Sequence, residues 1–214
     1  MNVKQMHTGV RLGVQKMNSA EPDDMLPQEI DYYLNNSITA FIKEQYSGLK
    51  DSNTSLQGQF VNENLRHLIV NIELENPTRV DIFPNSVQFS IDELDYEYYL
   101  FSQTNIKGVK KVNIPIQPTG ISHYLKSKTN NPLFRKLPII VSGEYLTILG
   151  DDETDFEPLN ETKLDLIYIK TPDQVDFLGN KDADFLPSHT HKQIVDHTVN
   201  QLLEDLQFRQ KGQQ

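Results

Sequence analysis

Two stretches of this sequence begin with Leu-Pro and continue as amphipathic helices: Leu26-Pro27-Gln28-Glu29-Ile30-Asp31-Tyr32-Tyr33-Leu34 and Leu186-Pro187-Ser188-His189-Thr190-His191-Lys192-Gln193-Ile194-Val195. Proline is tolerated at the first helical position because the N–H there has no partner within the helix. Apolar residues then recur at helical spacing, so each stretch predicts a sharp helix start. Because sequence rich in strand signals lies between the two helices, the chain predicts one domain with a β insertion.

The composition is that of a folded protein. Of 214 residues, 37% are hydrophobic, with 9 Tyr and 10 Phe, which is too apolar and too aromatic for a disordered chain. The absence of cysteine excludes disulfides, thiolate metal sites and a cysteine nucleophile. No run approaches the roughly 18 apolar residues of a membrane-spanning helix, and the first residues lack the apolar core of a signal peptide. We therefore expect a soluble intracellular protein.

Charge is distributed unevenly along the chain. The net charge of −10 argues against nucleic acid as the main ligand, because phosphate binding needs an excess of Lys and Arg. Residues 107–136 contain seven basic side chains and no acid, whereas residues 151–165 contain seven acids and one Lys. In a self-associating protein, such blocks predict contacts between the basic patch of one subunit and the acidic patch of the next. The basic patch comprises Lys107, Lys110, Lys111, Lys126 and Lys128, and the acidic patch comprises Asp151, Asp152, Glu153 and Asp155.

Apolar spacing predicts about four helices, which we expect to form an antiparallel bundle. They are a first helix over Val3–Met17, a second from Leu26, a third from about Phe60 to Ile69, and a last with its apolar stripe from Ile194 to Leu206. We assign residues 1–79 to the N-terminal helices and residues 80–172 to the β-rich insertion. Residues 173–214 then hold the C-terminal helix, which packs on the N-terminal helices, and a polar, mobile tail from residue 207.

The middle of the chain predicts an inserted antiparallel sheet of four or more strands. A tight turn at Gly143-Glu144 joins two apolar runs into a hairpin. Because Pro115 has no N–H to donate to a β ladder, the run over residues 109–117 predicts an edge strand or a bulge. Residues 92–101 fit either a short helix or a strand, and we favour the helix. The predicted fold class is therefore α+β, a helical bundle with an inserted sheet; its clearest strands are residues 138–142, 145–149 and 164–169.

Patterns typical of catalytic or metal sites are sparse. His189, His191 and His197 lie near one helix start, but no His-Glu-x-x-His supports a metal site, and we expect no cofactor. A nuclease of the restriction-enzyme type needs an acid on one strand and Glu-x-Lys on the next, to hold Mg²⁺ and activate water. Asp152, Glu161 and Lys163 have that spacing, so a Mg²⁺-dependent nuclease is the alternative function. Because so short a pattern arises by chance in an acidic hairpin, we expect no enzymatic activity.

Five segments, taken in their order along the chain, carry a resemblance to a known family. They are Met6–Met17 (Met-His-x-Gly-Val-x-Leu-Gly-Val-Gln-Lys-Met), Leu26–Asn35, Leu65–Val70, Asn131–Phe134 and Leu186–Val195. Together they resemble virion structural proteins of crAss-like and related short-tailed phages. Each motif alone is unspecific, but five in order, covering most of the chain, are hard to obtain by chance.

The resemblance implies a head-to-tail connector, or adaptor, that assembles as a dodecameric ring beneath the portal vertex. Its partners would be other copies of itself, the phage portal protein and other tail or ring proteins, with no membrane involved. DNA would pass through the ring without sequence-specific binding, and an acidic channel would keep the genome from adhering. The protein would be made in the host cytoplasm and reside in the virion. Adaptors of this family grip the portal through their C-terminal region, which implies docking through Phe208, Arg209 and Lys211.

Overall fold

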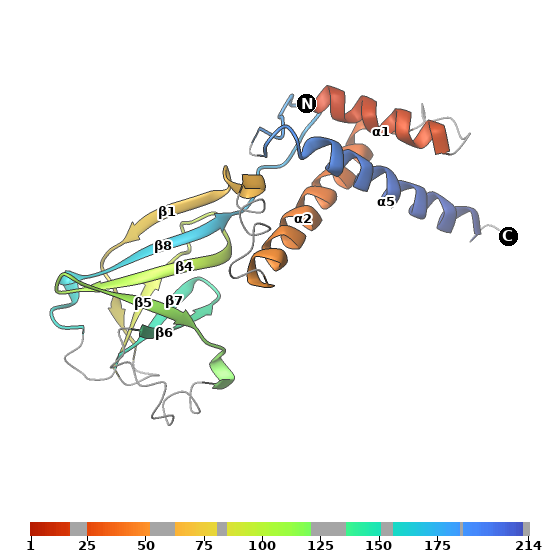
Figure 1. The fold of residues 1–214 in the computed structure, drawn as a ribbon. Helices are drawn as coiled ribbons and strands as arrows, with labels where there is room; N and C mark the ends of the chain where they lie inside the picture. Colours follow the sequence, from red (N-terminus) through yellow and green to blue (C-terminus); the bar gives the residue numbers. More distant parts are fainter. Residues whose placement is uncertain are drawn as a thin grey trace. The chain divides into compact units, whose positions relative to one another are not determined.

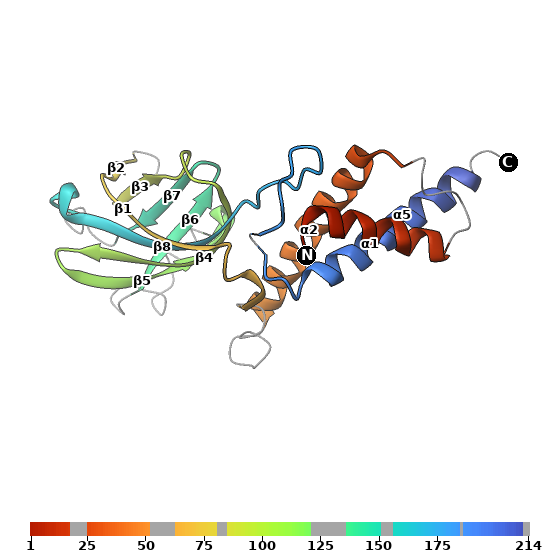
Figure 2. The ribbon, with the colours of Figure 1, turned by 90° about the horizontal axis from the view of Figure 1, so that it is seen from above.

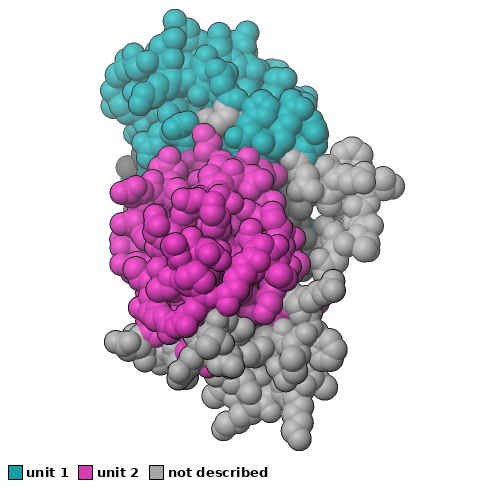
Figure 3. All heavy atoms as spheres, turned by 90° about the vertical axis from the view of Figure 1, so that its left-hand side faces the viewer, with its two compact units in different colours: residues 1–68, 172–214 teal, residues 69–171 magenta. Residues whose placement is uncertain are grey.

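The chain forms two compact units in the computed structural model (Figures 1 and 2). The structure describes residues 1–17, 25–51, 63–80, 85–120, 136–150, 156–184 and 186–211. The helical unit combines Met1–Leu68 with Pro172–Gln214, and the sheet unit comprises Ile69–Thr171 (Figure 3). Both parts of the chain that flank the sheet therefore build one helical unit.

Three long helices are described in the helical unit: α1 (Val3–Met17), α2 (Pro27–Asp51) and α5 (His191–Lys211). The predictions of α1 and of a helix start at Pro27 are confirmed. The second Leu-Pro does not start a helix directly, because the Thr190 N–H and Oγ1 both donate to the Pro187 carbonyl, at 3.0 and 2.8 Å, and form a turn first. Helix α5 continues to Lys211, past the predicted start of the tail at residue 207, and the mobility of the tail stays a prediction.

Helices α1 and α5 lie side by side and run in the same direction (Figures 1 and 2). Gly9 and Gly13 of α1 face Val195 and Val199 of α5, so both helices advance four residues together. A Cβ placed on Gly13 would lie 2.6 Å from Val199 Cγ2. The absence of a side chain at Gly13 therefore permits the close approach of the two helices.

Helix α2 crosses both partners rather than running alongside them (Figures 1 and 2). His7 of α1 bonds to Asp31 of α2, and Arg11 of α1 donates to the carbonyl of Met25, which precedes α2. Tyr33 and Ser37 of α2 bond to Asp205 and Gln201 of α5. The core among these helices is largely apolar, with buried polar groups such as His7, Ser37 and Thr198. Its fully buried apolar members include Val3, Met6, Val10, Ile30, Leu34, Ile38, Ile42, Leu65, Leu68 and Ile194.

The sheet unit contains one eight-stranded sheet in the order β1-β8-β4-β5-β6-β7-β3-β2. Every neighbouring pair is antiparallel except β5 and β6, which are parallel. The edge strands β1 and β2 are joined by residues 75–77 alone, which can span at most roughly 14 Å. The sheet must therefore curl until its two edges approach each other, as Figure 2 shows. The strands are β1 (Ile69–Leu74), β2 (Thr78–Arg79), β3 (Ser86–Ser90), β4 (Tyr96–Ile106), β5 (Val109–Pro115), β6 (Lys136–Ser142), β7 (Tyr145–Leu149) and β8 (Thr162–Lys170).

The α+β class holds, but the predicted helical bundle with a small antiparallel insertion is wrong. The sheet dominates the fold and is mixed. Strand β1 begins at Ile69, within the expected third helix. Strand β4 begins at Tyr96, within the helix expected over residues 92–101. Both strands are rich in β-branched or aromatic residues, which pack well on a pleated surface. The predicted hairpin of β6 and β7 and the strand at β8 are confirmed.

Pro115 was expected to mark an edge strand or a bulge; the edge strand is wrong, and the pairing of β5 with β4 and β6 shows no shift of register. Strand β5 lies between β4 and β6, and Pro115 is its last residue, where the ladder ends. The inner face of the curled sheet is packed with apolar side chains from both halves of the sheet. They include Val87, Phe89, Leu137, Ile139, Leu146, Ile148, Leu164 and Leu166. In the part of the chain that the structure describes, no helix has the length and apolarity to span a membrane.

Candidate functional site

Charged side chains gather at one end of the sheet unit. Strands β1 and β8 pair with Ile69 opposite Ile169 at one end and Leu74 opposite Leu164 at the other. The chain enters the sheet at Ile69 and leaves it after β8, so both connections to the helical unit lie at the first end. The second end holds the turn between β4 and β5, because Ile106 lies opposite Thr162. We call this second end the charged end, after Glu73, Glu75, Arg79, Lys107, Lys110, Glu157, Lys163 and Asp165.

Lys163 is held by two carboxylates at the charged end. Its Nζ lies 2.5 Å from Glu75 Oε1 and 2.9 Å from Glu73 Oε1. Hydrogen bonds to Glu75 and Glu73 raise the pKa of Lys163, and the bond from Lys163 lowers the pKa of Glu75. The ammonium is therefore engaged within the chain.

The residues of the alternative nuclease site are only partly described. Glu161 ends a short 3-10 helix, η4 (Leu159–Glu161), and Lys163 lies just beyond it on β8. Asp152 lies outside the described residues, so the catalytic trio stays a prediction. Among the residues that the structure covers, no group of three His, Asp or Glu side chains is placed to hold a metal ion.

Lys110 reaches across β4 to Asp165 of β8, with 2.7 Å between Nζ and Oδ2. The hydrogen bond to Asp165 raises the pKa of Lys110. Lys111 lies opposite Thr104, which is fully buried, so Lys111 is on the other face of the sheet from Lys110. The predicted basic patch is thus not one continuous surface within the described chain. Lys126 and Lys128 lie outside the described residues, as do Asp151, Asp152, Glu153 and Asp155 of the predicted acidic patch.

The turn between β4 and β5 places Lys107 in an unusual backbone conformation. Ile106 pairs with Val109, so Lys107 and Gly108 form a two-residue hairpin loop with φ of 52° and 81°. Positive φ at both positions is what a type I′ hairpin requires, and Asn or Gly satisfies it best. For a residue such as Lys this conformation costs roughly 1–2 kcal/mol. The other described non-glycine residues with positive φ are all asparagines: Asn76, Asn85 and Asn180.

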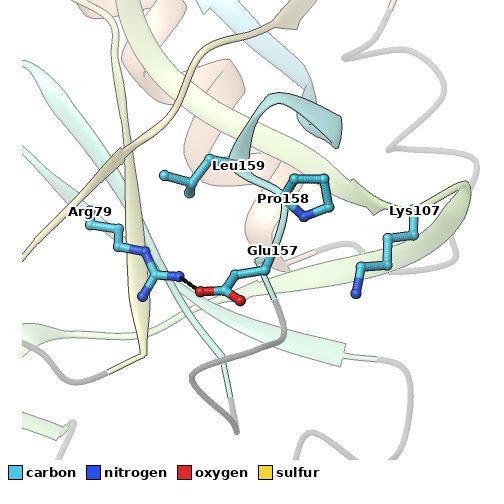
Figure 4. A pocket seen from close by; sticks show the side chains of 5 residues that line it. All are labelled: Arg79, Lys107, Glu157, Pro158 and Leu159. Atoms are coloured by element: carbon cyan, nitrogen blue, oxygen red, sulfur yellow. Dashed lines mark hydrogen bonds and ion pairs between the residues drawn. The ribbon is translucent and has the colours of Figure 1, made fainter.

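An open pocket of 720 Å³ lies beside this turn (Figure 4). Arg79 of β2 donates from Nη2 to Glu157 Oε1 at 2.7 Å, and both side chains are about half exposed. Lys107 lies on the opposite side of Glu157 from Arg79, while Pro158 and Leu159 supply apolar lining (Figure 4). Among the described residues Lys107 has no ion-pair partner. The pocket therefore offers one uncompensated cation next to an apolar wall.

The sequence predicted Lys107 as part of an inter-subunit basic patch, but it did not predict the pocket beside this residue. Arg79 and Glu157 are far apart in the chain, and they meet because the sheet curls. The available signal was local: a Lys-Gly pair between two strand-like runs marks a two-residue hairpin loop.

The three histidines near α5 do not converge on a metal. His191 is 3% exposed, and its ring nitrogens lie 2.8 Å from the Met1 amine and 3.1 Å from the Leu186 carbonyl. His189 instead bonds to Asn64 at 2.8 Å, and His197 is exposed. At the other end of α5, the structure places the backbone of Phe208, Arg209 and Lys211 in the helix, and portal docking through their side chains stays a prediction.

The chain was compared with protein-family models and with curated proteins. No protein-family model matches the chain, and a search of curated proteins gives no match.

Proposed function

We propose that this chain is a structural subunit of a ring at the head-to-tail junction of a short-tailed phage, where it connects head to tail and lines the DNA channel. The observation that carries the proposal is the exposure of large apolar side chains on both units. In the helical unit they are Leu12, Met17, Leu26, Tyr32 and Leu178, and in the sheet unit Phe101, Val109 and Tyr145.

Head-to-tail contacts close a ring only if each subunit offers two different surfaces. Two units with separate cores supply such surfaces, and burial of exposed apolar area drives association. Val109 is 57% exposed and lies in sequence between Lys107 and Lys110 at the charged end. An apolar residue with charged neighbours has the composition of an interface with a polar rim.

The segments that carry the family resemblance also support the proposal. His7 in the first segment bonds to Asp31 in the second at 2.7 Å, and both side chains are buried. His67 in the third segment lies 3.3 Å from the carbonyl of Asp184, and His189 in the last contacts Asn64. Four of the five segments thus lie wholly or partly in the helical unit, and Asn131–Phe134 lies outside the described residues.

Mass photometry of the purified full chain, alone and with portal rings, tests the proposal. We expect ring-sized assemblies at the mass of a dodecamer, formed alone or on the portal, and a ring in negative-stain images. Deleting residues 208–214 should leave folding nearly unchanged and abolish co-sedimentation with portal rings, because the deletion removes Phe208, Arg209 and Lys211. A monomer under all conditions, with portal present, would contradict the proposal.

A plasmid-nicking assay with Mg²⁺ and Mn²⁺ tests the nuclease alternative. We expect no cleavage, because Lys163 is already bound by Glu73 and Glu75. Cleavage that disappears in Glu161→Ala would overturn the structural proposal in favour of the enzyme.

A further inference from the structure

We propose that the pocket at the charged end binds a carboxylate side chain presented by a neighbouring copy of this chain, with Lys107 as the receiving cation. This inference rests on the proposed function, since it names the contact that joins two subunits of the ring. It is carried by the pocket, by the lack of an ion-pair partner for Lys107 among the described residues, and by the backbone conformation of that lysine.

The charges that line the pocket leave one cation available. Glu157 is bound by Arg79 at 2.7 Å, so this pair compensates itself. Lys107 lines the same pocket and has no ion-pair partner among the described residues. An incoming anionic group would meet Lys107 on one side and the apolar surface of Pro158 and Leu159 on the other.

The backbone at Lys107 points to a role for its side chain. Its φ of 52° suits Asn or Gly, and asparagine occupies every other described non-glycine position with positive φ. Lysine is strained there and gains nothing from the turn itself. Strain of this kind persists where a side chain is needed for function. The turn holds the Lys107 ammonium at the edge of the pocket, where Figure 4 shows it.

A carboxylate of a protein fits the pocket better than a nucleic-acid phosphate. Nucleic-acid binding depends on many Lys and Arg side chains along a strand. The eight side chains after which the charged end is named are four cations and four carboxylates, and among these eight Lys107 alone has no ion pair within the described residues. A single carboxylate beside apolar contacts matches this arrangement. Each copy of the chain carries 30 acidic against 20 basic side chains, so a neighbouring copy has carboxylates to offer.

Variants of Lys107 test the inference in the assembled full chain. Lys107→Asn removes the charge and keeps a residue that favours the turn, and Lys107→Glu reverses the charge. Lys136→Glu changes an exposed lysine of the same unit, at the start of β6, and serves as the matched control. We expect Lys107→Asn to raise the concentration for half-assembly roughly tenfold and Lys107→Glu to raise it further, whereas the control assembles as the wild type. High salt should narrow these differences.

A second measurement identifies the ligand chemistry directly. A polyglutamate peptide should shift the amide resonances of Lys107 and Gly108 in the wild type but not in Lys107→Glu, whereas an oligothymidylate should leave them unchanged. Equal or tighter binding of the oligothymidylate would overturn the inference in favour of phosphate. Wild-type assembly of Lys107→Glu would overturn it while the proposed ring stands. If the wild type forms no ring and polyglutamate still shifts Lys107, the proposed function fails and the neighbouring copy is excluded as the source.

Discussion

Asp31 on α2 accepts hydrogen bonds from the backbone N–H of Phe177, at 3.1 and 3.3 Å. One helical turn further on, Asn35 accepts from the Val175 N–H at 2.8 Å and donates to the Val175 carbonyl at 3.0 Å. Residues four apart on a helix are separated by about 6 Å along its axis, and residues two apart in an extended chain by about 6.6 Å. Because these spacings match, two side chains of α2 bond to alternate residues, Val175 and Phe177, of the segment that connects β8 to α5.

Replacing Asn35 by Ala should destabilise the helical unit by about 1–3 kcal/mol, because it leaves two backbone groups of Val175 without their partner. Asn36 is exposed on the same helix, so Asn36→Ala is a matched control and should cost only the small amount typical of a surface change. Chemical denaturation gives the free energies, and hydrogen exchange should show faster exchange at Val175. Equal exchange in both variants would show that Asn35 does not hold the connection.

Gly13→Ala should destabilise the packing of α1 on α5. The new Cβ would lie 2.6 Å from Val199 Cγ2, so the helices must separate, at a cost of about 1–3 kcal/mol that exceeds the gain of roughly 1 kcal/mol in helix propensity. At Gly9 the nearest atom, Val195 Cγ1, is 3.1 Å away, so Gly9→Ala should be milder. Thermal unfolding compares the two variants. Adding Val199→Ala should restore part of the loss in Gly13→Ala, and no restoration would point to another cause.

The acid limb of the stability profile should depend on Lys163. The bond from Lys163 lowers the pKa of Glu75 below its ordinary 4.5, so this pair stabilises the fold above that pH and the effect is lost as the pH falls through the lowered pKa. Lys163→Met should therefore raise the pKa of Glu75 toward 4.5, which carboxyl NMR titration measures. Lys192→Met, at an exposed lysine of α5, is the control and should leave Glu75 unchanged.

The same substitution should alter the alkaline limb. Hydrogen bonds to Glu75 and Glu73 raise the pKa of Lys163 above its ordinary 10.5. This contribution is present below that pH and is lost as the pH rises through the raised pKa. The free energy of unfolding should thus fall less steeply with rising pH in Lys163→Met than in the wild type. Identical slopes in the two proteins would show that Lys163 is unpaired in solution.

Asn113→Ala should destabilise the sheet unit by about 1–3 kcal/mol. The Asn113 side chain donates to Ser102 Oγ at 2.7 Å and accepts from Thr104 Oγ1 at 2.9 Å, and all three side chains are buried. Removing the amide leaves buried hydroxyl groups without that partner. Urea denaturation measures the loss. Gln117→Ala, at an exposed position just after β5, should be nearly neutral, and a similar loss there would contradict a role for the buried network.

The helices of the chain ends could be predicted from sequence because their signals are local. The stripe of Val3, Met6, Val10 and Val14 faces the core at helical spacing, and Pro27 begins α2 where a proline is tolerated. The hairpin of β6 and β7 likewise follows from two apolar runs around a glycine turn. Such signals depend only on residues within a few positions of each other.

Strands β1 and β4 depend on distant partners, and their short apolar runs fit either a helix or a strand. Ile69 becomes part of a strand because it pairs with Ile169 of β8, which is distant in the chain. The charged end depends on the same pairing. Sequence alone determined that residues 107–136 are rich in lysine, but the tertiary structure decided which lysines are paired. The order β1-β8-β4-β5 brings Asp165 to Lys110 and Glu73 and Glu75 to Lys163, and it leaves Lys107 in a turn beside its pocket, because strand pairing joins residues that are distant in the chain.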